Sequence, residues 1–292
     1  MNIFLTGATG YIGSAVADAL MTAGHSVTGL ARSDEAAGKL RLKGVTPHRG
    51  DLTSPAGLIG AVNALDGVIH AGYANDGRVD QAAAQAMLDA LQGSGKPFVY
   101  TSGVWVLGNT GGQIADESAP LNPASPVTWR PAVERMVLDS AQRGVRPIVI
   151  RPAVVYGRGG GIPADLVNSA RDNGAARYVG TGENRWALID VDDLADLYLR
   201  AFEHAPAGTL LHAADASAHR VKEIAEAASA AVGRDGVTES WPLEDARKTL
   251  GAYADGLVLD QRVSSAKAIA MLGWRPRARG VLDDLRSGSY VS

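Results

Sequence analysis

The chain has 292 residues, of which 46% are hydrophobic and 20% are charged, as in ordinary globular proteins with a full core. A formal net charge of −3 leaves no basic excess for a nucleic-acid backbone, and the absence of cysteine excludes disulfides and thiolate chemistry. Glycine or charge interrupts every apolar run, and the first residues lead directly into a strand. We therefore expect a soluble cytoplasmic protein with neither a nucleic-acid nor a membrane partner.

Short β-branched segments alternate with alanine-rich segments of helical length in the first half of the chain. The pattern predicts strands at 2–6, 26–30, 45–49, 66–70, 97–101 and 146–151. Helices are predicted between them at 11–23, 34–42, 55–63, 79–92 and 128–143. This order predicts an α/β fold with a Rossmann doubly wound parallel sheet.

The alternation becomes irregular after about residue 152. The glycine run 157–161 suggests a flexible break, and later helices are predicted at 192–204, 221–232 and 264–271. Apolar stretches at 186–191 and 208–212 are expected to return to the sheet as edge strands. We predict a dinucleotide-binding domain over 1–155 and a smaller substrate-binding lobe over 156–292, partly interleaved with the sheet.

A glycine-rich turn follows the first strand and opens the first helix. In Thr6-Gly7-Ala8-Thr9-Gly10-Tyr11-Ile12-Gly13, Gly7 permits the tight turn, Gly10 lets a pyrophosphate approach and Gly13 allows close helix packing. The N–H groups at the helix start favour phosphate. The alternative is a flexible turn, but its strand and helix context favours a dinucleotide site.

The cofactor type is indicated at the end of the second predicted strand. An acidic residue there would bond the ribose 2′-hydroxyl of NAD, but the sequence places Arg32 and Ser33 at this point. A guanidinium suits a 2′-phosphate, so we predict NADPH in preference to NADH. The alternative is that Arg32 is a solvated loop residue.

Ordered motifs after the later strands make the chain resemble the extended short-chain dehydrogenase/reductase family, which includes nucleotide-sugar epimerases and dihydroflavonol-type reductases. They are Gly50-Asp51-Leu52, His70-Ala71-Gly72, Thr101-Ser102-Gly103, Arg151-Pro152-Ala153-Val154-Val155-Tyr156-Gly157, Asp190-Val191-Asp192-Asp193 and Leu272-Gly273-Trp274-Arg275-Pro276. The resemblance implies that Asp51 and Leu52 border the adenine. It also implies that Ala71 and Gly72 lie along the phosphates and the nicotinamide ribose.

The catalytic set of this family is missing. Its members carry a Ser or Thr after the fifth strand and a Tyr-x-x-x-Lys on the next helix, where the lysine lowers the pKa of the tyrosine. Here Gly103 stands at the Ser/Thr position, and Thr128-Trp129-Arg130-Pro131-Ala132-Val133-Glu134 replaces the tyrosine and lysine. The sequence predicts the cofactor site together with a nonstandard proton donor.

Three residues near the strand ends are the candidate catalytic groups. Arg130 could polarise a carbonyl, although it could instead pair with Glu134 one turn away on the helix. Tyr73 could donate a proton or be a half-buried core residue, and Ser102 could bond the substrate or merely form a turn. His70 is expected to be structural.

Four aromatic residues are expected to converge on an apolar substrate pocket, although each could instead belong to the core; they are Trp105, Trp129, Tyr156 and Trp186. No metal site is expected, because the six histidines are scattered. The stripe Val133, Met136, Val137 and Ala141 could form a homodimer interface or pack inside the chain.

These features predict an NADP(H)-dependent oxidoreductase acting on a small carbonyl or hydroxyl compound. One alternative is a redox-neutral epimerase or dehydratase that retains its cofactor. The other is a noncatalytic NADP-sensing protein.

Overall fold

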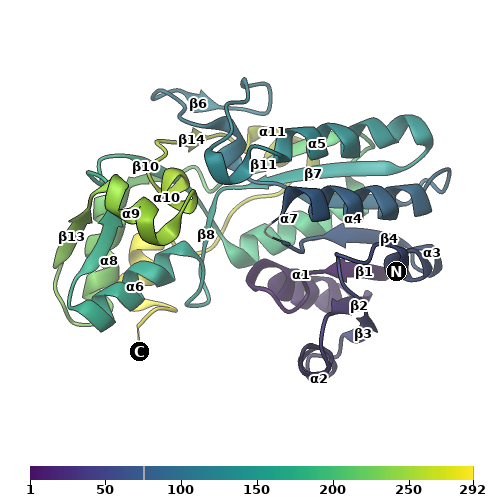
Figure 1. Ribbon diagram of the computed structural model, residues 1–292, viewed down its shortest axis with the longest axis horizontal. Coiled ribbons are helices and arrows are strands. Elements are labelled where there is room, and N and C mark those ends of the chain that lie inside the picture. The colour runs from purple at the N-terminus through teal and green to yellow at the C-terminus, as the bar shows by residue number, and fades with distance from the viewer. Residues whose placement is uncertain (75, 292) are drawn as a thin grey trace.

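The computed structural model describes residues 1–74 and 76–291, and a seven-stranded parallel sheet is its main feature (Figure 1). The strand order is β11-β7-β5-β4-β1-β2-β3. The bounds are β1 (Asn2–Thr6), β2 (Ser26–Ala31), β3 (Thr46–Arg49), β4 (Gly67–His70), β5 (Pro97–Thr101), β7 (Arg146–Pro152) and β11 (Thr209–Ala213). The predicted doubly wound sheet is confirmed. The order reverses between β1 and β4, where such sheets bind ligands beyond the carboxyl ends of their strands.

Helices cover both faces of this sheet. On one face α1 (Tyr11–Thr22) packs against α7 (Val191–His204), and both contribute apolar side chains to one core cluster. The other face is covered by α3 (Ala56–Ala64), α4 (Gly77–Ala90) and α5 (Arg130–Asp139), with a second cluster beneath them. The short α2 (Asp34–Leu42) lies beside β3. Because both faces are covered, β4 is buried along its whole length.

A smaller lobe with its own core lies beside the sheet, at the left of Figure 1. Its helices are α6 (Ile162–Asn173), α8 (Val221–Ala230), α9 (Leu243–Leu250), α10 (Tyr253–Leu257) and α12 (Val281–Ser287). Its strands are β8 (Val154–Tyr156), β9 (Ala176–Val179), β10 (Arg185–Asp190), β12 (Ala218–Arg220) and β13 (Thr238–Trp241). The remaining elements are β6 (Ile114–Ala115), β14 (Arg262–Val263), α11 (Ala266–Leu272) and three 3₁₀ turns at Val104–Leu107, Ser125–Val127 and Ser140–Arg143.

One of the two predicted returning strands joins the large sheet. The stretch predicted at 208–212 forms β11, which pairs with β7 at the edge. The prediction for 186–191 is wrong, because this segment forms β10 and pairs with β8 and β12 in a separate small sheet. The apolar content of the two stretches does not show which strand each of them pairs with.

The glycine-rich segment 157–161 connects the large sheet to the smaller lobe, and hydrogen bonds hold it in place, so it is not a flexible break. The Tyr11 hydroxyl donates to the Gly157 carbonyl at 2.7 Å, and the Tyr290 hydroxyl donates to the Gly160 carbonyl at 2.6 Å. Arg158 forms ion pairs with acidic residues on α1 and α7. Glycine is needed here for its backbone, since φ at Gly157 is +100°. Among the residues described, no helix is long and apolar enough to cross a membrane.

Candidate active site

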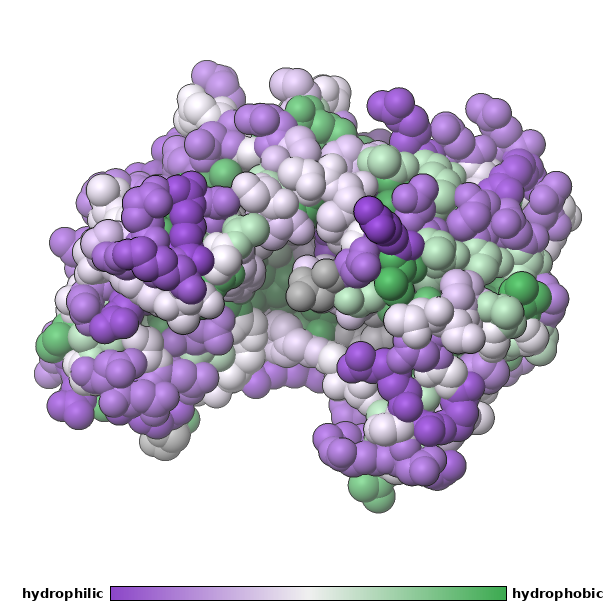
Figure 2. Space-filling model, viewed as in Figure 1, coloured by the Kyte–Doolittle hydropathy of each residue, from purple (hydrophilic) through white to green (hydrophobic). Residues whose placement is uncertain are grey.

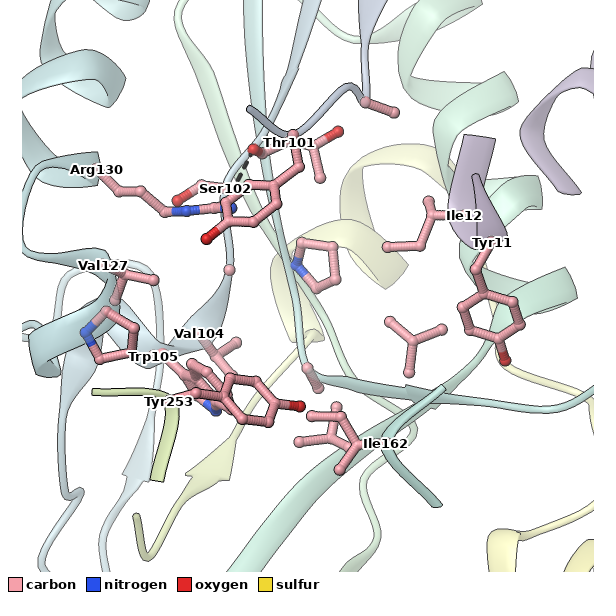
Figure 3. A pocket seen from close by; sticks show the side chains of 18 of the residues that line it. Tyr11, Ile12, Thr101, Ser102, Val104, Trp105, Val127, Arg130, Ile162 and Tyr253 are labelled. Carbon is pink, nitrogen blue, oxygen red and sulfur yellow. Dashed lines mark hydrogen bonds between the residues drawn. The ribbon is translucent and has the colours of Figure 1, made fainter. Parts of the chain in front are cut away.

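A cavity of about 1200 Å³ opens where β4, β5 and β7 end, between the sheet and the smaller lobe. Figure 2 shows this hollow as a deep recess with a hydrophobic floor. Figure 3 shows its lining, with Tyr11 and Ile12 on one side and Ser102 and Arg130 on the other. The start of α1 and the end of β5 therefore face the same space.

The glycine loop forms the wall of this cavity at α1. A Cβ on Gly7 would lie 2.4 Å from the Ala71 carbonyl oxygen, and one on Gly13 would lie 2.1 Å from the Gly7 carbonyl oxygen. Both positions therefore require glycine. Gly10 has an ordinary φ of −83° and caps α1 without a side chain, and the first turn of α1 holds no acid. The free N–H groups at this helix start suit a dinucleotide pyrophosphate.

A buried polar cluster supports the loop from behind. The Gly72 N–H donates to Thr6 Oγ1 at 3.0 Å, and Thr6 Oγ1 lies 2.6 Å from His70 Nδ1. His70 Nε2 lies 3.3 Å from Asp80 Oδ1 without hydrogen-bond geometry, and the Tyr100 hydroxyl donates to Asp80 at 2.6 Å. His70 therefore has the structural surroundings that the sequence suggested.

The residues assigned to the adenosine side follow β2 and β3. Arg32 is exposed, and Ser33 caps α2 by accepting a hydrogen bond from the Ala36 N–H at 3.1 Å. Hydrogen bonds from Thr53, and more weakly the charge of Arg32, lower the pKa of Asp51. The Leu52 side chain reaches the backbone at Gly72, where an added Cβ would lie 3.1 Å from it. Thr9 is exposed in the glycine loop.

The end of β5 and the start of α5 place two polar side chains at the cavity. Arg130 Nη1 donates to the Thr101 carbonyl at 3.1 Å, which fixes the guanidinium across the strand end. Arg130 Nε and Ser102 Oγ are both buried and have no hydrogen-bond partner among the described residues. Ser102 is only 5% exposed. A buried polar atom without a partner is costly, so these two atoms are suited to a bound ligand.

Glu134 does not pair with Arg130. It accepts two hydrogen bonds from Arg151 on β7, at 2.6 and 2.9 Å, and both residues are buried. Arg151 also lies 3.3 Å from His212 on β11, and burial, aided by this guanidinium, lowers the pKa of His212 to about 3. Because Glu134 pairs with Arg151, it does not pair with Arg130, whose side chain lines the cavity.

Aromatic side chains flank Arg130. Its guanidinium carbon lies 5.2 Å from the centre of the Trp129 ring and 5.8 Å from that of the half-exposed Tyr73. Both distances are within the range of cation–π attraction. Trp105 lines the same cavity, and its ring lies 5.5 Å from that of Tyr253.

Two of the four predicted substrate-binding aromatics line this cavity, namely Trp105 and Trp129. Trp186 lines a second, smaller cavity in the lobe. Tyr156 packs in the core of the lobe, where its hydroxyl donates to Asp215 and to the Arg279 carbonyl. Among the lining residues that sequence reasoning missed are Val127, Ile162, Leu250 and Tyr253. They come from distant segments, and no motif marked them.

The helical stripe considered for a dimer is largely buried within the chain. Val133 and Val137 are buried in the cluster beneath α4 and α5, and Met136 packs against that cluster. In the structure, this part of α5 therefore packs inside the chain.

Comparison with known protein families shows which family this chain belongs to. The family described as "NAD dependent epimerase/dehydratase family" matches residues 3–213. The chain belongs to this family. Its members include enzymes that use NAD(P), in agreement with the glycine loop described above.

Relatives in the family differ in their chemistry. The uncharacterized protein YLL056C of Saccharomyces cerevisiae is 35% identical over 98% of each chain. The 2-alkyl-3-oxoalkanoate reductase of Stenotrophomonas maltophilia is 25% identical over 88% of this chain and 83% of its own. The dTDP-glucose 4,6-dehydratase of Streptomyces venezuelae, solved with NAD bound, has a TM-score of 0.83 at 19% identity and covers 99% of this chain and 96% of its own. The family and the reductase support an NAD(P)-dependent oxidoreductase-like activity, and the dehydratase structure shows the shared fold.

Proposed function

We propose that this protein is an NADP(H)-dependent reductase of a small carbonyl compound. The observation that carries this proposal is the pair of buried, unpartnered atoms Ser102 Oγ and Arg130 Nε in the cavity that the glycine loop also lines. Both are hydrogen-bond donors, and a carbonyl oxygen is an acceptor. The reductase among the relatives agrees with this choice.

The proposed cofactor is a phosphorylated nicotinamide dinucleotide. Gly7 and Gly13 form a turn that any Cβ would block, and α1 begins with uncapped N–H groups. By the family resemblance, Asp51 and Leu52 would border the adenine, and Ala71 and Gly72 would follow the phosphates. Arg32 would bind the 2′-phosphate, which favours NADPH over NADH. When bound, this cofactor supplies the hydride for carbonyl reduction.

The residues at β5 and α5 would orient and activate the substrate. Arg130 is held by the Thr101 carbonyl and would donate from Nε to the substrate oxygen, while Ser102 would donate from Oγ. Negative charge that develops on this oxygen would be stabilised by the preorganised guanidinium. A guanidinium is a poor proton donor, so Arg130 would act through its hydrogen bond and its charge. Tyr73, whose ring lies beside Arg130, would transfer the proton that completes the alcohol.

The smaller lobe would hold the remainder of the substrate. Ile162, Leu250 and Tyr253 from this lobe line the cavity opposite Ser102 and Arg130. This division of labour agrees with the proposed domains, 1–155 for the cofactor and 156–292 mainly for the substrate.

A cofactor oxidation assay tests the proposal. Purified protein with NADPH and a panel of ketones and aldehydes should lose nicotinamide absorbance as each carbonyl is reduced. Arg130→Ala should lower kcat/KM at least about tenfold, which corresponds to about 1.4 kcal/mol of transition-state stabilisation. Arg135→Ala is the matched control, since Arg135 is an exposed residue on the same helix. Equal losses in the two variants would contradict the role of Arg130.

Other outcomes of this assay identify the alternatives. Substrate turnover without net oxidation of the cofactor would favour an epimerase or dehydratase. Tight NADPH binding with no turnover across the whole panel would favour a sensing protein. Either result would overturn the proposed reductase.

A further inference from the structure

A second cavity of about 380 Å³ lies inside the smaller lobe and meets the main cavity. Three residues line both spaces, namely Ile162 at the start of α6, Leu250 at the end of α9, and Tyr253 in α10. The rest of its lining includes the aromatic and aliphatic side chains Leu166, Tyr178, Val179, Trp186, Val221, Trp241 and Leu257. A molecule bound in the main cavity could therefore extend past Tyr253 into an apolar space.

Two polar groups that line this second cavity, those of Trp186 and Arg177, already have partners within the chain. Trp186 Nε1 donates to the Leu257 carbonyl at 3.1 Å. Arg177, its basic lining residue among those described, forms hydrogen bonds with Glu239 at 3.0 to 3.2 Å and lies 5.4 Å from the centre of the Trp241 ring. The charge of Arg177 is thus largely neutralised, and the cavity offers little to attract a phosphate.

The junction between the cavities also disfavours an anion. It contains the start of α6, where Gly161 provides no side-chain cap and N–H groups would favour negative charge. Asp165, however, stands in the first turn of this helix and lines the second cavity. Burial raises the pKa of Asp165, because partial desolvation penalises its charged form, and a phosphate nearby would add repulsion. The Asp165 carboxyl therefore already lies at the start of α6, where a phosphate would otherwise be favoured.

We infer that the second cavity binds a flat, uncharged, apolar end of the substrate, such as a phenyl ring, while the carbonyl lies beside Arg130. Such an end would stack on Trp186 and Trp241 and bury apolar surface, which is favourable without any new charge contact. A nucleoside diphosphate would instead place two phosphates near Asp165. The inference relies on the proposed reductase function only for the position of the carbonyl.

A binding experiment tests the apolar end independently of catalysis. Phenylbutanol, which carries the ring but no carbonyl, should bind the NADPH-saturated protein in isothermal titration calorimetry, whereas uridine diphosphate should not. Leu250→Asp places a charge at the junction and should weaken phenylbutanol binding about tenfold or more. Leu250→Trp, which narrows the junction without a charge, should weaken it as well.

Leu282→Asp is the matched control, because Leu282 is also half-buried in the lobe but lines neither cavity. Thermal unfolding and NADPH affinity, measured for each variant, separate a local effect from misfolding. Uridine diphosphate binding more tightly than phenylbutanol would overturn the inference. So would phenylbutanol affinities in both Leu250 variants equal to that of the parent.

A kinetic comparison separates this inference from the proposed function. Benzylacetone should have a KM at least about tenfold below that of butanone, and Leu250→Asp should remove most of this difference. If neither ketone is reduced but phenylbutanol binding depends on Leu250, the reductase proposal fails and the apolar site remains. If both ketones are reduced with equal KM values, the reductase remains and the apolar site fails.

Discussion

The glycine loop and the end of β5 face the same cavity but are built in different ways. The loop is made of backbone, and its two most constrained positions, Gly7 and Gly13, allow no side chain at all. The site at β5 is made of side chains, with Arg130 held across the strand by the Thr101 carbonyl. The loop carries glycines at positions 7, 10 and 13, while the start of α5 has Trp129 and Val133 where the family resemblance led us to expect a tyrosine and a lysine.

The two parts therefore depend on different features of the chain. A backbone cradle depends on glycines a few residues apart, so a single change breaks it. The side-chain site depends on buried partners, such as the Arg151 guanidinium that pairs with Glu134 on α5. The following predictions test how far the β5 site depends on that support.

The largest effect is expected from breaking the buried Glu134–Arg151 pair. Glu134→Ala leaves the Arg151 charge buried without its partner and should lower the free energy of unfolding by about 3 to 5 kcal/mol. Urea unfolding monitored by circular dichroism measures this change. The double variant Glu134→Leu with Arg151→Met should recover much of the loss, because it removes both charges. A loss below about 1 kcal/mol in Glu134→Ala would show that the pair is not a support.

The proposed cofactor site is tested by a substitution at Arg32. Arg32→Ala should weaken NADPH binding about ten- to hundredfold, the equivalent of about 1.5 to 3 kcal/mol, and leave NADH binding unchanged because NADH lacks the 2′-phosphate. Fluorescence titration with both cofactors measures this. Arg41→Ala on the neighbouring helix is a control of equal charge. Equal affinities of the parent for NADPH and NADH would refute the choice of cofactor.

An effect that develops only as the pH falls is expected at His212, which lies beside Arg151. Burial holds the pKa of His212 at about 3, below its ordinary value of 6.5, so the unfolded chain binds this proton more readily than the folded one. Its contribution to stability is therefore complete above pH 6.5 and is lost as the pH falls towards 3. His212→Asn should flatten the fall in stability between pH 6.5 and pH 4. Parallel profiles for parent and variant would contradict this assignment.

No gain in turnover is expected from restoring the family pair. In Trp129→Tyr with Val133→Lys, the new lysine replaces the Val133 side chain, which lies on the buried side of α5 and is only 1% exposed. A buried lysine is desolvated and lies next to Glu134, so it would not serve the tyrosine. Turnover measured with the best substrate of the panel should stay at or below that of the parent. A faster double variant would mean that the β5 site is a decayed family site.

The sequence alone predicted the parallel sheet because its signals are local. Buried strands appear as short β-branched runs, and the glycine spacing of 7, 10 and 13 needs no distant partner. The assignment of 186–191 to the sheet failed because an apolar run does not specify which strand it joins. Much of the smaller lobe was not predicted for the same reason, since its short strands pair with segments far away in the chain.

The polar site was only partly contained in the sequence. Ser102, Arg130 and Tyr73 could be named because they follow strands or replace a known motif, and the structure brings all three to one cavity. Whether Glu134 would pair with Arg130 or elsewhere depended on Arg151, 17 residues away on β7. Ile162, Leu250 and Tyr253 meet only after the lobe folds over the sheet. Helix and strand periodicity is set by neighbouring residues, whereas cavity lining and ion pairing are set by tertiary packing.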